Sequence, residues 1–242
     1  ERFAILEEMT NASISQDIKA MIVSGPPGIG KSYGVEKQLE KASMFDVISA
    51  VDQKYEVVKG AMTPLGLYST LYKHSASGHV LVFDDCDVVL QDDLSLNLLK
   101  AALDSGKKRR VCWNADSHLL RREGIPNSFD FEGSVIFITN LKFNHIRSKK
   151  LQDHLEALQS RCHYLDLTLD TMRDKLLRVR QIAETGELFN DYNLSDKQGK
   201  EIIAFMEKHK NELREMSLRM ALKIADLCTI SEKRWKLLAK NT

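Results

Sequence analysis

Eight residues near the start of the chain have the types and order of a phosphate-binding loop. Residues 25–32 satisfy the pattern GxxxxGK[ST] in full, between an apolar run and a helical stretch. Glycines let such a loop wrap around phosphates, the lysine reaches the β and γ phosphates, and the serine ligates Mg²⁺. An incidental glycine turn would not explain a lysine and a serine in register. We expect ATP and Mg²⁺ to bind Gly25, Pro26, Pro27, Gly28, Ile29, Gly30, Lys31 and Ser32.

A second run, residues 80–85, is apolar and ends in two carboxylates, as a Walker B element requires. We expect Asp84 to hold the magnesium ion, through water or with Ser32, as the second metal ligand. Asp85 stands where a glutamate usually orients the attacking water, and it is one methylene shorter. Hydrolysis would then be slow or depend on Asp87. The alternative is that these acidic residues only cap the next helix.

The elements that must position these residues alternate over the first two thirds of the chain. Short runs rich in β-branched and aromatic residues predict buried strands, separated by helical stretches in a βαβ pattern. Residues 45–51 compete with 55–59 for the second strand. The predicted strands are 21–24, 55–59, 80–83, 135–139 and 163–167.

The strand pattern ends near residue 168, and apolar residues then recur at helical spacing. We expect an α/β core over residues 1–168 and an all-helical domain over 169–242. Asp170 and Ser195 are the expected N-caps of two of its helices. The predicted helices are 171–183, 197–209, 213–227 and 232–239.

With these motifs placed, the chain resembles the AAA+ family of P-loop ATPases over essentially its whole length. The resemblance implies a five-stranded parallel sheet of order 5-1-4-3-2 with a C-terminal helical lid. It also implies ATP hydrolysis at subunit interfaces, in a homo-oligomer or a hetero-oligomeric ring. Residues around Asp17 and Ile18 would lie against the adenine.

The same resemblance implies roles for three further residues. Asn140, at the end of a strand, looks like sensor 1, which positions the lytic water; a strand-terminating turn is the alternative. Ser160, Arg161 and Cys162 are similar to the SRC motif of clamp loaders, whose arginine acts on a neighbour's ATP. Arg219 falls where the lid's sensor 2 arginine would be. For both arginines the alternative is a solvated position on a helix.

The substrate of such an ATPase is less well defined by the sequence. Basic runs at 107–110, 121–122 and 147–150, together with the SRC tripeptide, favour DNA or a DNA-bound assembly, although such runs are often solvated loops. Residues 59–63 are a candidate loop for gripping a polypeptide, but they lack an aromatic residue. A slow nucleotide-dependent switch is the third reading.

The segment from Gly106 to Gly133 is longer than a simple connection needs. It predicts an extra hairpin, with residues 109–113 and 129–131 as its two arms. The alternative is that Trp113 and Phe129 pack on the sheet.

Net charge, hydropathy and cysteine spacing limit the classes of protein to which the chain can belong. A formal net charge of +1 gives no global field that favours nucleic acid, and no apolar run reaches the roughly 20 residues that span a bilayer. Four scattered cysteines without CxxC spacing favour a reducing, cytoplasmic setting. The histidines show no metal-ligand spacing. The chain begins at Glu1 without a methionine or a signal-peptide pattern, consistent with a trimmed N-terminus.

Overall fold

The computed structural model describes residues 1–48, 53–141 and 149–241. It divides into two compact units. The first comprises Glu1–Gly25 and Lys31–Leu167, and the second comprises Pro26–Gly30 and Thr168–Thr242.

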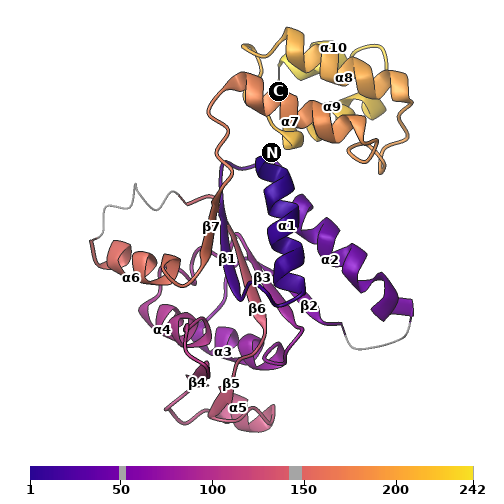
Figure 1. The fold of residues 1–242 in the computed structure, drawn as a ribbon. Coiled ribbons are helices and arrows are strands. Elements are labelled where there is room, and N and C mark those ends of the chain that lie inside the picture. Colours follow the sequence, from indigo (N-terminus) through magenta and orange to yellow (C-terminus); the bar gives the residue numbers. More distant parts are fainter. Residues whose placement is uncertain (49–52, 142–148, 242) are drawn as a thin grey trace. The chain divides into compact units, whose positions relative to one another are not determined.

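A five-stranded parallel sheet forms the centre of the first unit (Figure 1). Its order is β2-β3-β6-β1-β7. Counted along the chain and read from the other edge, this is the predicted order 5-1-4-3-2, so that prediction is confirmed. The strands are β1 (Ala20–Ser24), β2 (Tyr55–Lys59), β3 (Val80–Asp84), β6 (Ser134–Thr139) and β7 (His163–Asp166).

Helices cover both faces of this sheet (Figure 1). Because side chains alternate along a strand, Ile22, Phe83 and Phe137 point to one face, where they join a core with helices α3, α4 and α6. The other face is covered by α1 and α2, which pack against each other. The helices are α1 (Arg2–Ile14), α2 (Lys31–Ile48), α3 (Pro64–Lys73), α4 (Asp93–Ala102) and α6 (Lys149–Gln159).

The competing second strand at 45–51 is wrong as far as the structure describes it. Helix α2 continues through Ile48, and residues 49–52 lie outside the described part. Tyr55–Lys59 pairs with β3 instead, with Lys59 opposite Asp84.

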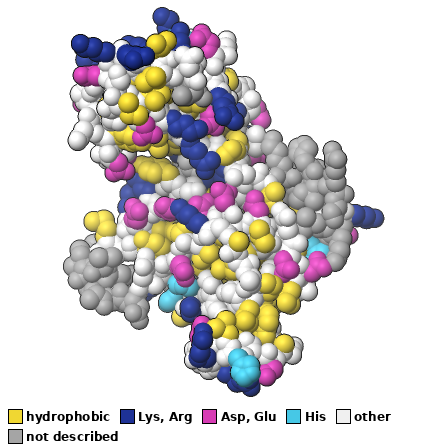
Figure 2. Space-filling model, turned by 180° about the vertical axis from the view of Figure 1, so that it is seen from behind, with side chains coloured by type: hydrophobic (Ala, Val, Ile, Leu, Met, Phe, Trp, Pro, Cys, Tyr) yellow, Lys and Arg dark blue, Asp and Glu magenta, His cyan; other side chains and the backbone are white. Residues whose placement is uncertain are grey.

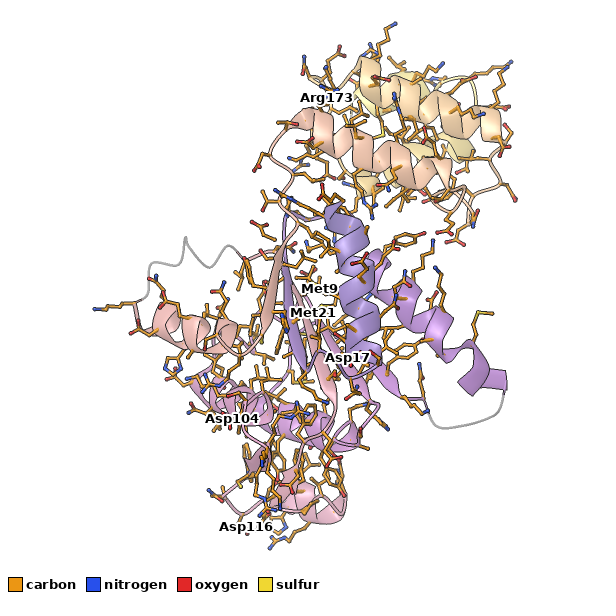
Figure 3. The ribbon with its side chains drawn as sticks, in the orientation of Figure 1. Met9, Asp17, Met21, Asp104, Asp116 and Arg173 are labelled. Carbon is orange, nitrogen blue, oxygen red and sulfur yellow. The ribbon has the colours of Figure 1, made fainter. Side chains whose placement is uncertain are left out.

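The predicted hairpin is present between α4 and β6. Strands β4 (Arg110–Cys112) and β5 (Ser128–Asp130) pair antiparallel and are joined through the short helix α5 (His118–Arg122). Phe129 packs edge-on against Tyr68 at 5.1 Å between ring centroids, so the aromatic residues of this hairpin also belong to the core. Asp104 and Asp116, labelled in Figure 3, lie before and within this insertion.

The second unit contains four helices around a separate core. Its helices are α7 (Met172–Glu184), α8 (Asp196–Lys208), α9 (Leu218–Ile230) and α10 (Trp235–Lys240). Ser195 caps α8 in a capping box with Gln198, which confirms that prediction. The N-cap of α7 is Thr171 rather than Asp170, because the Thr171 side chain accepts from the Asp174 N–H.

Helix α9 begins at Leu218, five residues after the predicted start. The Ser217 hydroxyl accepts the Met220 N–H at 3.1 Å and so caps the helix there.

Within the described part of the chain, no helix combines the length and the apolar character needed to cross a membrane.

Candidate active site

The topology of the first unit brings three polar chain segments to one edge of the sheet. The loop after β1, the end of β3 and the end of β6 meet there, because the carboxyl ends of parallel strands lie at the same edge. β1 and β3 are both neighbours of β6. Residues that are more than 100 positions apart in sequence can therefore touch.

Lys31 opens α2 and is buried at this edge. Its Nζ donates to the Gly25 carbonyl oxygen at 2.7 Å and to Asn140 Oδ1 at 2.7 Å. Gly28 and Gly30 have φ of +72° and +92°, a region that glycine enters without strain. The loop thus turns back so that the Lys31 ammonium is held beside its own backbone.

Ser32 and Asp84 form a second contact in the same place. The Ser32 hydroxyl donates to Asp84 Oδ1 at 2.9 Å, and Asp84 is buried at the end of β3. A hydroxyl next to a buried carboxylate provides the hard oxygen donors that Mg²⁺ prefers. The residues predicted to hold magnesium therefore fit that ion in type and in proximity.

Asp85 has an unusual backbone conformation. Its φ is +53°, and its N–H donates to the Ile138 carbonyl oxygen at 3.0 Å. Asn140 Nδ2 donates to Asp85 Oδ1 at 2.8 Å. Asn140 therefore accepts from Lys31 and donates to Asp85, and so links the lysine predicted to bind phosphate to the second carboxylate. Left-handed backbone outside glycine concentrates at functional sites.

Asp87 lies close to this group but is held differently. Its Oδ1 accepts the Thr139 hydroxyl at 2.6 Å. Burial raises the pKa of Asp87, and the charge of Asp85 raises it further, against the lowering effects of the Thr139 hydroxyl and Lys31. Asp87 is thus a partly buried acid fixed to β6.

Lys59, at the end of β2, lies beside these residues, although the sequence predicts it only as the end of a strand and the start of a polypeptide-gripping loop. Its Nζ lies 2.7 Å from Glu36 Oε1 and 3.5 Å from Asp84 Oδ2. The contact with Glu36 raises the pKa of Lys59. The sequence holds one indication of this contact, because Lys59 and Asp84 each stand at the carboxyl end of a strand.

Arg161 lies between α6 and β7, away from the contacts described above. Its Nη1 donates to the Ala157 carbonyl oxygen at 2.6 Å, at the end of its own helix. Its Nε is buried and has no hydrogen-bond partner within the described residues. The predicted role of Arg161 toward a neighbouring ATP stays a prediction.

Arg219 belongs to the second unit, in the first turn of α9, and is exposed. That unit includes loop residues Pro26–Gly30, and within it the Leu218 N–H donates to the Gly28 carbonyl oxygen at 2.8 Å. The sensor role of Arg219 also stays a prediction. In the described residues no cluster of three or more histidines, cysteines or acidic residues could hold a metal ion.

No family model matches the chain. Several solved structures share its fold at low sequence identity. The ADP form of Aeropyrum pernix ORC2 has a TM-score of 0.54 at 12% identity, over 100% of this chain and 67% of that one. Domain III of the replication initiation protein DnaA from Thermotoga maritima has a TM-score of 0.52 at 8% identity, over 98% and 90%. Saccharomyces cerevisiae Hsp104, in a complex with casein, has a TM-score of 0.51 at 18% identity, over 94% and 38%.

A much closer similarity is to an uncharacterized 36.7 kDa protein of Enterobacteria phage T4, from the nrdC–mobD intergenic region. The two are 37% identical over 241 residues, which covers 99% of this chain and 72% of the phage protein. The chain therefore belongs to the family of this phage T4 protein, and its fold is that of the AAA+ P-loop ATPases.

Proposed function

We propose that this chain binds ATP with Mg²⁺ at the described edge of the sheet and hydrolyses it. The observation that supports this most strongly is the connection from Lys31 through Asn140 to Asp85. A cation for the phosphates, an amide and a carboxylate are thus joined in one chain of hydrogen bonds. That is the set of groups that positions a phosphoryl group and a water for in-line attack.

Each residue has a distinct task in this proposal. Ser32 and Asp84 would hold magnesium, which supplies charge neutralisation at the phosphates when bound. Asp85 orients the attacking water and accepts its proton, and Asn140 keeps the Asp85 carboxylate in place. Arg161 would act on the ATP of a neighbouring subunit, and Arg219 would act from the helical unit.

The proposed substrate is DNA or a DNA-bound protein assembly, and the alternative is a polypeptide. Among the structures of this fold are a replication initiation protein and a complex with casein, which represent these two classes. Lys107, Lys108 and Arg122 are exposed on the insertion, whereas Arg110 and Arg121 pair with Asp130 and Asp116. On the face drawn in Figure 2, Lys and Arg side chains are interspersed with Asp and Glu rather than gathered in one basic surface. A DNA contact through the exposed basic residues of the insertion would neutralise few phosphates, and its affinity would fall with salt in proportion to their number.

The nucleotide assignment is tested with Lys31→Ala. A buried ammonium facing phosphates cannot be replaced by water at equal energy, so we expect ADP affinity to fall by about 100-fold or more. Calorimetric titration of ADP with Mg²⁺ measures this. Lys41→Ala is the matched control, since Lys41 is an exposed lysine on the same helix. Equal ADP affinity in wild type and Lys31→Ala would refute the site.

The substrate class is tested by ATP turnover alone, with single- or double-stranded DNA, and with an unfolded protein. Stimulation by DNA that disappears at high salt supports the first class. Stimulation by the polypeptide alone supports the second, and slow turnover that nothing accelerates supports a switch.

A further inference from the structure

Three charged side chains form a cluster beside the proposed magnesium ligands. Lys59 Nζ lies 2.7 Å from Glu36 Oε1 and 3.5 Å from Asp84 Oδ2. They come from the end of β2, the second turn of α2 and the end of β3. The cluster is not explained by the roles proposed above, because none of them uses Lys59 or Glu36.

The arrangement engages both oxygens of Asp84. Oδ1 accepts the Ser32 hydroxyl, and Oδ2 faces the Lys59 ammonium. Asp84 has only 7% of its side chain exposed, so water alone does not neutralise its charge. Glu36 Oε1 is likewise buried and forms an ion pair with Lys59. One lysine therefore balances two carboxylates.

We infer that Lys59 is the counter-ion of the magnesium-free site and that it gives up Asp84 when magnesium binds. This inference rests on the proposed function. A divalent cation at Ser32 and Asp84 would stand beside the ammonium and repel it. Lys59 can leave at low cost, since 58% of its side chain is exposed, and Glu36 remains a partner for it.

A displacement of the Lys59 side chain would also affect residues 60–63, which follow it in the chain. Lys59 is joined directly to Gly60, whose φ is +92°, and Met62 packs against the core. Thr63 caps α3 by accepting the Gly66 N–H at 3.1 Å. A change in the position of Lys59 would therefore alter the conformation of residues 60–63, a short loop whose far end is fixed by the Thr63 cap.

The test uses Lys59→Met, which keeps the aliphatic stem and removes the charge. ADP binding by the full chain is measured by calorimetry over a series of Mg²⁺ concentrations. We expect the Mg²⁺ midpoint to fall roughly two- to fivefold, the range for an ion pair with one exposed partner. Lys54→Met, at an exposed position just before β2, changes net charge equally and should leave the midpoint unchanged.

A second measurement separates displacement from a simple charge effect. On addition of Mg²⁺ and ADP, amide hydrogen exchange of residues 60–63 should change in wild type and in Lys54→Met, but not in Lys59→Met. An unchanged midpoint in Lys59→Met, or the same exchange change in all three proteins, would overturn the inference while ADP binding persists. Loss of ADP binding in all three, at every Mg²⁺ concentration, would instead overturn the proposed function.

Discussion

Asn140 connects the two charged groups of the candidate site because its amide carries an acceptor and a donor on one planar group. The oxygen faces the Lys31 ammonium and the nitrogen faces the Asp85 carboxylate. An aspartate here would repel Asp85, and an apolar residue would leave the buried Lys31 with one contact fewer. The amide of Asn140 thus serves both neighbours at once.

Asp85→Asn tests the second carboxylate. Asparagine tolerates a left-handed backbone, so the fold should be kept, but the amide cannot accept the proton of the attacking water. We expect the rate of phosphate release to fall about 100-fold or more, with ADP affinity changed by less than about threefold. Rapid-quench turnover and calorimetry measure the two quantities.

Asp87→Asn is the comparison for this variant. Asp87 is fixed by the Thr139 hydroxyl, and burial favours its neutral form, so its conversion to an amide should alter turnover far less. The reverse ranking, with Asp87→Asn the slower enzyme, would move the water-positioning role from Asp85 to Asp87.

The central strands could be predicted from the sequence because both of their faces are covered. β1, β3 and β6 are buried at every position and read as continuous apolar runs. β2 at the sheet edge is only partly buried, so its sequence is no more strand-like than residues 45–51, the first of which belong to α2. The first turn of α9 was misplaced because Ser217, as an N-cap, outweighs the apolar periodicity before it.

The residues of the candidate site that belong to a sequence motif could be predicted. The contacts that depend on how neighbouring strands align could not. Lys31 and Ser32 lie in the first turn of α2, Asp84 ends β3 and Asn140 directly follows β6, and the parallel topology brings them together. The pairing of Lys59 with Asp84 follows from how β2 aligns with β3, which no local pattern encodes.

The hairpin is an element whose stability depends on one aromatic contact surface. Phe129 is buried between Tyr68 and Tyr72, at 5.1 and 5.3 Å between ring centroids. Phe129→Ala should lower the free energy of unfolding of the protein by about 3 kcal/mol, because a large buried ring leaves a cavity. Urea unfolding measures this, with the exposed Arg122→Ala as control. A loss below about 1 kcal/mol would mean that the hairpin is not part of the core.

At the scale of the whole molecule, Arg161 is the residue whose predicted role requires a neighbouring subunit. Its guanidinium reaches only the end of its own helix, and the buried Nε has no hydrogen-bond partner within the described residues. A buried donor without a partner costs about 1–3 kcal/mol. Because this Nε is covered by the chain's own atoms, the Arg161 side chain would have to leave its present position to reach a phosphate of a neighbouring subunit. The proposed trans role therefore rests on the resemblance of its motif.

Arg161→Ala should bind ADP normally yet hydrolyse ATP roughly 10³- to 10⁵-fold more slowly, because an arginine finger stabilises charge only in the transition state. Mixing it with Lys31→Ala should restore part of the activity, at interfaces that pair an intact loop with an intact arginine. Wild-type activity per chain should rise with protein concentration as subunits associate. Turnover assays across a dilution series, on single and mixed proteins, measure all three effects. If Arg161→Ala is as active as wild type and activity per chain is independent of concentration, the arginine does not act across an interface of this chain.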